Sequence, residues 1–442
     1  MGKADNPLRA AAVVAILGLL FGGCTARPGF LPGTSPAPGQ PGQPGQPGQP
    51  GNPGPINPGQ VASGAPDWIA AGTRLHWYAA AASVAESRFS WVEDPNGNWE
   101  DPRTGKKYRR TDESGEGQPG ASGDGLSQID VVSVDGGNVV LSATLLGFVR
   151  PNNLLLYTPL GGQSVNGTNV DGAWIHPAIL AQYAAGDPSG GLTVLRGPYA
   201  VGNNTYDAIS FVTGLGAASG NYSSYSYDIQ SGVLLSANTS TGGVTSPLAA
   251  PGENPPVGNT QLTMARFVGV RQRTMPGAGA ANPDFLAGTS QLRYSGTYNW
   301  INPVDPSSGN LTYPAEHTVS LGPGGTSWAS YAGRTLVPGL AIDSTIQGVC
   351  GSLGPYWYSA QALGQMTAGQ ALDHDPVTAE QTTVSFAGQG QSGVAVVTIE
   401  TQGPGYLIRS TYEQASGLLV AYEEATPQTT GITVVLQLIE RR

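Results

Sequence analysis

The chain has 442 residues, a formal net charge of −10 and only 11% charged side chains. A net negative charge makes nucleic acid and anionic membrane surfaces unfavourable partners, because both carry charge of the same sign. Two cysteines permit at most one intramolecular disulfide, so that the fold must be stabilised by a hydrophobic core, for which the chain is long enough.

The N-terminal segment has the three parts of an export signal. Lys3 and Arg9 give the start a positive charge, residues 10–21 form an apolar run, and Gly22 and Gly23 precede Cys24. The apolar run is shorter than the roughly 20 residues that a membrane-spanning helix needs. We therefore expect this segment to be a signal peptide that is removed after export.

The segment resembles the lipobox signal of bacterial lipoproteins, in which a Leu and two small residues precede a Cys. Here Phe21 occupies the position of that Leu, and Leu20 lies one place earlier. The resemblance covers residues 1–25. It implies removal of residues 1–23, lipid such as diacylglycerol and palmitate on Cys24, and stable attachment to a membrane by two or three acyl chains. The alternative is an ordinary signal peptide with an incidental cysteine.

This resemblance implies a location on the outer side of a bacterial membrane, which is either the cell membrane or the outer membrane. It also leaves Cys350 without a disulfide partner, because Cys24 is the other cysteine of the chain. Residues 24–66 then form a tether. Gly-Gln-Pro occurs four times from Gly39 onward, and six such triplets are too few for a collagen triple helix. We expect a single-chain polyproline-II spacer, which extends by about 3.1 Å per residue.

The remaining sequence repeats itself. Trp174 precedes Gly186 by the same interval that separates Trp357 from Gly369, with Leu and Gln in step between them. Further on, Tyr-Asp-x-x-Ser-Gly ends at Gly232, and Tyr-Glu-x-x-Ser-Gly ends later in the chain at position 417. These matches predict two homologous domains, residues 67–280 and residues 281–442.

Each predicted domain has the pattern of antiparallel β-structure. Residues 394–400, 406–412 and 418–422 alternate apolar and polar side chains and predict a three-stranded meander. Residues 177–185 and 360–367 are the best helix candidates, and the paired tryptophans are expected to pack each helix on its sheet. The predicted fold is thus mainly β: two homologous antiparallel β-rich domains, each with one short helix, after a Pro/Gly-rich tether.

Two surfaces are candidates for binding a partner. The first is the basic run in the charge-rich segment 93–124, which suits an anionic envelope polymer, although a solvated hairpin is the simpler interpretation. The second is a tyrosine pair on one strand face, which suits a glycan or an apolar ligand or else fills cross-strand positions. The residues concerned are Lys106, Lys107, Tyr108, Arg109, Arg110, Tyr225 and Tyr227.

Chemistry-bearing residues give weaker signals. Asp94, Asn96 and Asn98 have the first three spacings of a calcium loop, but the Gly and Glu that such a loop requires later are absent. Residues 373–375, Asp-His-Asp, have metal-ligating types, yet they precede a proline in what is expected to be a plain turn. We expect no catalytic, metal or cofactor residue.

Cys350 is expected to be a small buried hydrophobe. Ser327 lacks the Gly-x-Ser-x-Gly elbow of serine hydrolases, and His317 is expected at the start of a strand.

The function that this pattern favours is a lipid-anchored, non-enzymatic binding or interaction module of the cell envelope. One alternative is a carrier or sensor of lipids or lipoproteins, because a curved antiparallel sheet with a short helix resembles the folds of periplasmic lipoprotein carriers and sensors. A further alternative is an envelope hydrolase. The expected partners are the membrane, through the lipid on Cys24, and an envelope polymer, lipid or protein.

Overall fold

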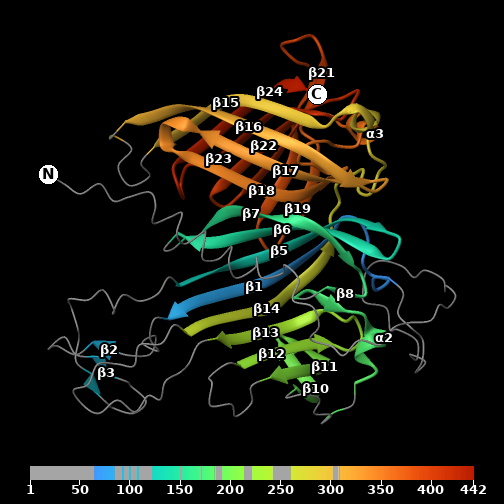
Figure 1. Ribbon diagram of the computed structural model, residues 1–442, viewed down its shortest axis with the longest axis vertical. Helices are drawn as coiled ribbons and strands as arrows, with labels where there is room; N and C mark the ends of the chain where they lie inside the picture. The colour runs from blue at the N-terminus through green and yellow to red at the C-terminus, as the bar shows by residue number, and fades with distance from the viewer. Residues whose placement is uncertain are drawn as a thin grey trace. The chain divides into compact units, whose positions relative to one another are not determined.

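A computed structural model of the chain describes residues 64–84, 92–93, 99–100, 107–108, 122–149, 152–170, 172–183, 185, 192–213, 222–241, 260–301, 307 and 309–442. The described chain is mainly β, as predicted, with two large antiparallel sheets of nine and ten strands (Figure 1). No helix in these ranges is long and apolar enough to cross a membrane.

The nine-stranded sheet has the order β10-β11-β12-β13-β14-β1-β5-β6-β7. Its strands are β1 (Thr73–Val84), β5 (Ser122–Asp135), β6 (Asn138–Val149), β7 (Leu154–Asn166), β10 (Leu192–Val201), β11 (Asn204–Thr213), β12 (Tyr222–Asp228), β13 (Leu234–Thr241) and β14 (Thr260–Gln272). Two small sheets accompany it: β2 (Val92–Glu93), β3 (Trp99–Glu100) and β4 (Lys107–Tyr108), and β8 (Asn169–Val170) with β9 (Trp174–Ile175).

The ten-stranded sheet has the order β18-β17-β16-β15-β24-β23-β22-β21-β20-β19. Its strands are β15 (Gln291–Ile301), β16 (Asn310–Gly324), β17 (Trp328–Val337), β18 (Ile342–Gly351), β19 (Ala371–Asp375), β20 (Glu380–Gln389), β21 (Ala395–Gly403), β22 (Tyr406–Glu413), β23 (Leu419–Thr426) and β24 (Ile432–Arg441). The predicted meander is confirmed, because β21, β22 and β23 are consecutive antiparallel neighbours.

The two sheets share one strand order. In each, the first long strand of the series lies next to the last: β1 neighbours β14, and β15 neighbours β24. On the side of the first strand the following strands continue outward in chain order, and on the side of the last strand the preceding strands continue outward in reverse chain order. The boundaries predicted from the repeat, residues 67–280 and 281–442, stay a prediction.

By packing, the chain divides into two compact units that interleave along the sequence. The first holds Tyr78–Asp124 and Asn169–Phe267, and the second holds Ser63–Trp77, Gly125–Thr168 and Val268–Arg442. The boundaries between the units fall within the strands β1, β5 and β14. Each unit is therefore made of segments that are not consecutive in the sequence.

The two predicted helices are shorter than expected. They are α2 (Pro177–Leu180) and α3 (Ala360–Leu363), and the side chains of His176 and Ser359 cap their first turns. After each helix the backbone hydrogen bonds tighten, since Gln182 N donates to Ile179 O and the chain after α3 makes the same three-residue bonds. This tightening ends the α-helices about one turn early.

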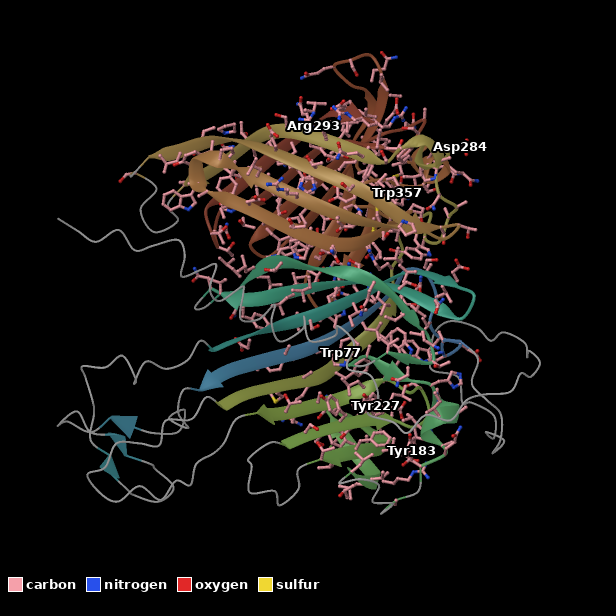
Figure 2. The ribbon with its side chains drawn as sticks, in the orientation of Figure 1. Trp77, Tyr183, Tyr227, Asp284, Arg293 and Trp357 are labelled. Carbon is pink, nitrogen blue, oxygen red and sulfur yellow. The ribbon has the colours of Figure 1, made fainter. Side chains whose placement is uncertain are left out.

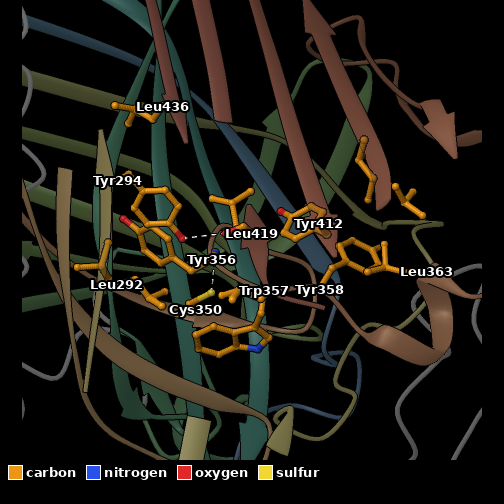
Figure 3. Packing of buried hydrophobic residues seen from close by; sticks show 14 of the residues in the cluster. Leu292, Tyr294, Cys350, Tyr356, Trp357, Tyr358, Leu363, Tyr412, Leu419 and Leu436 are labelled. Carbon is orange, nitrogen blue, oxygen red and sulfur yellow. Dashed lines mark hydrogen bonds between the residues drawn. The ribbon is translucent and has the colours of Figure 1, made fainter. Parts of the chain in front are cut away.

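The second unit contains a large aromatic core (Figure 3). Trp357, Tyr294 and Cys350 are 0%, 2% and 0% exposed. The Tyr294 hydroxyl donates to Leu419 O at 3.2 Å, and the Tyr356 amide lies 3.3 Å from Cys350 Sγ. The buried tyrosine therefore has a hydrogen-bond partner, as a polar group removed from water requires.

Candidate functional site: an ionic cluster and a tyrosine face

The second compact unit holds a dense group of buried charges, here called the ionic cluster. Its members come from β1, β5, β14 and the residue after it, β19 and β20, which lie far apart in the sequence. They are Arg74, His76, Asp130, Arg271, Arg273, Asp373, Asp375 and Glu380.

Arg74 lies at the centre of the ionic cluster, and its side chain is 3% exposed. Its Nε and Nη2 donate to the two carboxylate oxygens of Asp130 at 2.6 and 2.9 Å. Its Nη1 donates to Asp375 Oδ2 at 3.1 Å and to Glu380 Oε1 at 2.9 Å. One guanidinium thus binds three carboxylates, which offsets the large cost of removing these charges from water.

A second guanidinium group, that of Arg271, binds Asp373, the other acidic residue of β19. Arg271 donates from both terminal nitrogens to the carboxylate of Asp373, and it also donates to His374 O at 2.9 Å. Thr274 adds a backbone and a hydroxyl donor to Asp373 Oδ1, each at 3.0 Å. The Asp373 carboxylate is therefore held on two sides by charged and neutral donors.

His76 is the exception in this otherwise paired cluster. Its side chain is fully buried, and Nε2 lies 3.1 Å from Asp375 Oδ2. Although this is an ion-pair distance, neither ring nitrogen has an aligned hydrogen-bond partner in the described part of the chain. A buried polar group in that condition is costly and calls for a physical explanation.

Electrostatics hold the carboxylates of Asp130 and Asp375 in the charged form. Burial alone would raise the pKa of Asp130, but the guanidinium groups of Arg74 and Arg273 outweigh it and lower the pKa to about 2. Burial opposes ionisation of Asp375 as well, and contacts with His76 and Arg74 hold its pKa below the ordinary value. The Arg74 pKa is raised despite burial, because Asp130 and Glu380 favour the cation.

The ionic cluster connects to a phenol. The Tyr406 hydroxyl donates to Glu380 Oε2 at 2.8 Å, and the pKa of Tyr406 is raised by burial and by the Glu380 charge. The Tyr406 ring lies 5.3 Å, centroid to centroid, from that of Tyr157 on β7. Glu380 and Tyr406 therefore link the charges to a set of aromatic side chains.

That set, here called the tyrosine face, lies on one side of the ten-stranded sheet with Tyr157 packed against it. Register pairs Tyr298 with both Tyr313 and Val434, and it pairs Val434 in turn with Glu424, so these side chains share a face. The members are Tyr157, Tyr298, Tyr313, Tyr331, Tyr422 and Glu424, and all are half-buried.

The tyrosine face combines burial with residual access. Burial raises the pKa values of Tyr157, Tyr422 and Glu424. Each nevertheless keeps part of its surface accessible. The Tyr422 hydroxyl donates to Glu424 Oε2 at 2.7 Å. Rings that offer apolar area together with hydroxyl groups suit a ligand that is partly apolar and partly hydrogen-bonding.

The ionic cluster was not predicted from the sequence, because the segment that contains Asp373 and Asp375 was not expected to be a strand. Residues 373–375 were expected to lie in a short loop after the helix, with a plain Asp-Pro turn, but they belong to strand β19. Strand alternation points Asp373 and Asp375 inward and leaves His374 exposed. The available signal was Arg74, a charged residue that is followed by Leu75 and Trp77 in a largely apolar strand.

Of the predicted binding residues, the structure describes Lys107, Tyr108, Tyr225 and Tyr227. Lys107 and Tyr108 form β4, paired with β3, while Lys106, Arg109, Arg110 and Cys24 lie outside the described residues. Tyr227 is 4% exposed, and its ring lies 6.1 Å from Phe211, which in turn contacts Tyr183 (Figure 2).

Tyr227 is therefore a core residue that fills a cross-strand position. It is not part of an exposed aromatic surface. Tyr225 is half-buried on the same strand and opposes Phe211 and Ala237 in register. A contribution of Tyr225 to a partner surface stays a prediction.

Other residues singled out from the sequence have structural roles. Cys350 is fully buried, and burial raises the pKa of its thiol to about 12. Ser327 Oγ lies 2.6 Å from Ser133 Oγ, with which it shares a hydrogen bond. His317 lies in the middle of β16 and not at a strand start, and its ring nitrogens contact Thr335 and Tyr356 at 2.9 Å each.

No protein-family model matches this chain, and no curated protein is similar to it. Among the described residues, no group of three or more His, Cys, Asp or Glu side chains is arranged to hold a metal ion.

Proposed function

We propose that the protein is an exported lipoprotein, anchored through lipid on Cys24 to the outer side of a bacterial membrane, and that its β-rich part acts as a binding module. The single observation that carries the anchor is the charged start, apolar run and Gly-Gly-Cys sequence at residues 1–24. The Gly/Pro-rich segment that follows supports a spacer between membrane and folded part.

Three features of the second compact unit support binding over catalysis. Asp373, Asp375 and Glu380 of the ionic cluster are engaged by guanidinium groups and nearly closed off from solvent, so they have little access to a substrate. The thiol of Cys350 is buried and held protonated. The tyrosine face, by contrast, keeps accessible rings and hydroxyl groups, and it is the surface that we assign to a ligand.

A carrier of an apolar ligand is the second candidate function. The observation that favours it is the partial accessibility of Tyr157 and Tyr422 in positions where burial already raises their pKa values. An acyl chain with a hydrogen-bonding head group would match the rings and the Tyr422–Glu424 pair.

We infer in addition that the β-rich part arose by duplication. The shared strand order of the two sheets supports this, as do two local matches. Trp174 forms an isolated bridge with Val233, Trp357 forms one with Leu418, and both indoles are fully buried. Each tryptophan immediately precedes a capped four-residue helix region.

The anchor is tested by expressing the full chain in a bacterial host and comparing two cysteine variants. Cys24→Ala should abolish acylation, measured by intact mass, and should release the protein from the membrane fraction. Cys350→Ala is the matched control, which removes the other cysteine and should leave acylation unchanged. Equal membrane association of Cys24→Ala and the wild type would overturn the anchor.

The ligand is tested by native mass spectrometry of the released Cys24→Ala chain. A co-purified acyl-bearing molecule that is lost in a Tyr422→Phe, Glu424→Gln double variant would establish the carrier function. A Tyr225→Phe variant serves as control, because this residue lies on the other sheet. If no ligand co-purifies, the carrier function is wrong. The binding module would then have a macromolecular partner, which crosslinking of the anchored chain in intact cells should capture.

A further inference from the structure

The ionic cluster has an uneven charge. It contains the four carboxylates of Asp130, Asp373, Asp375 and Glu380, but only three guanidinium groups, those of Arg74, Arg271 and Arg273. With a neutral imidazole at His76, the cluster carries one more negative charge than positive charges. An unbalanced charge at a buried site is destabilising, because the low-dielectric interior does not screen it.

His76 is positioned to supply the missing positive charge. It is fully buried on β1, two residues from Arg74, and its Nε2 lies 3.1 Å from the Asp375 carboxylate on β19. Its ring nitrogens have no aligned hydrogen-bond partner among the described residues, so that neither nitrogen is committed elsewhere. A small rotation of the ring would convert the contact with Asp375 into a charged hydrogen bond.

Two of the carboxylates, those of Asp130 and Asp375, are poor proton acceptors. The pKa of Asp130 is lowered to about 2, because the guanidinium groups of Arg74 and Arg273 outweigh burial, and the pKa of Asp375 is lowered by its contacts with His76 and Arg74. Of the groups present, an imidazole is the one whose ordinary titration falls between pH 5 and 8. In the ionic cluster, the charged groups that accompany His76 are Arg74 on β1, Asp130 on β5, Arg271 on β14, Arg273 after it, Asp373 and Asp375 on β19, and Glu380 on β20.

We propose that the ionic cluster is a proton-responsive lock, in which a proton taken up by His76 balances the cluster and fastens β19 and the start of β20 to β1 within the second compact unit. Loss of that proton leaves Asp375 in contact with a neutral ring and weakens the attachment. The lock thus tightens in mildly acidic surroundings and loosens as the pH rises. Nothing in this device requires the proposed anchor or ligand.

The lock is tested by hydrogen exchange of the full chain, measured by mass spectrometry on peptides covering residues 371–380 and corrected for the intrinsic effect of pH. We expect their protection factors to fall by about tenfold or more from pH 6 to pH 8, since tenfold corresponds to one unit of altered proton affinity. A His76→Gln variant should show no such change. His374→Gln is the matched control, because His374 is exposed on the same strand, and it should behave as the wild type.

Each outcome decides the matter. Protection that does not vary with pH in the wild type overturns the lock, and so does a pH effect that survives in His76→Gln or disappears in His374→Gln. Should His76→Gln fail to fold, Asp375→Asn provides the second test, because it removes the carboxylate that the imidazolium is proposed to bind. Carbon-13 NMR of labelled histidines in the wild type gives an independent test: an imidazole at His76 that stays neutral from pH 5 to pH 8 also overturns the proposal.

Discussion

Gly417 lies so close to the backbone of Tyr358 that a Cβ at position 417 would be 2.0 Å from the Tyr358 carbonyl oxygen. The same two residues are joined by a hydrogen bond from Tyr358 N to Gly417 O at 2.8 Å. In the other sheet, Gly232 stands in the same relation to Ile175, with a Cβ-to-oxygen distance of 2.0 Å and a hydrogen bond of 2.9 Å. In both repeats, therefore, the glycine of the Ser-Gly turn packs directly against the backbone of the residue that follows the paired tryptophan.

Gly417→Ala should be strongly destabilising. The backbone at Gly417 has a φ of 74°, which costs an alanine about 1 kcal/mol or more, and the contact with Tyr358 O adds a steric clash to that cost. Denaturant unfolding of the variant against the wild type measures the loss. Gly393→Ala is the control, since Gly393 has a φ of 75° but nothing within 4 Å of its Cβ position. Equal losses in the two variants would show that the contact contributes nothing.

The Cys350 thiol should be unreactive in the folded protein. Its side chain is fully buried and its pKa is raised to about 12 by burial, so almost no thiolate exists at pH 8. In the Cys24→Ala chain, Cys350 is the remaining cysteine, and alkylation by iodoacetamide can be followed by mass. We expect modification in denaturant and none under native conditions. Rapid native labelling would mean that the aromatic core opens far more readily than its packing indicates.

Asp130 should stabilise the fold at neutral pH and lose that effect in strong acid. Its folded pKa of about 2 lies below the ordinary value of 3.8, so the carboxylate contributes stability above pH 4 that disappears as the pH falls through about 2. From this shift we expect Asp130→Asn to cost on the order of 2 kcal/mol at pH 7, with a smaller cost toward pH 2. Asp343→Asn is the control, because its partner Arg334 is exposed and such pairs contribute little. A pH-independent cost of Asp130→Asn would contradict the ion-pair explanation.

The fold was largely predictable from local patterns, whereas the ionic cluster was not. Alternation and Ser-Gly turns locate β21, β22 and β23 because these strands pair with their neighbours in sequence. Arg74 and Asp375 are separated by 301 positions, and no local pattern reports which carboxylate a buried arginine will meet. The helices were predicted too long for a related reason, since their ends depend on where the chain must turn to continue the sheet. Burial of Tyr227 likewise follows from its contact with Phe211 on another strand.

His317 should make the protein sensitive to mild acid. Burial lowers its pKa to about 4, below the ordinary value of 6.5, so the folded state favours the neutral ring. Stability is therefore fully present above pH 6.5 and is lost as the pH falls toward 4, because the unfolded chain takes up the proton first. The shift corresponds to a loss on the order of 3 kcal/mol across that interval.

His317→Gln removes the titrating group while keeping a donor and an acceptor near Thr335 and Tyr356, which contact the two ring nitrogens in the wild type. The free energy of unfolding, measured in denaturant at several pH values, should fall less steeply between pH 6.5 and 4 in this variant than in the wild type. The effect has the opposite sign to that proposed for His76, whose protonation strengthens the structure, so the two histidines are separable by the direction of their pH dependence. A variant with the same acid slope as the wild type would mean that His317 already carries its proton in the folded state, and the stacked arrangement with Tyr356 would then need a different explanation.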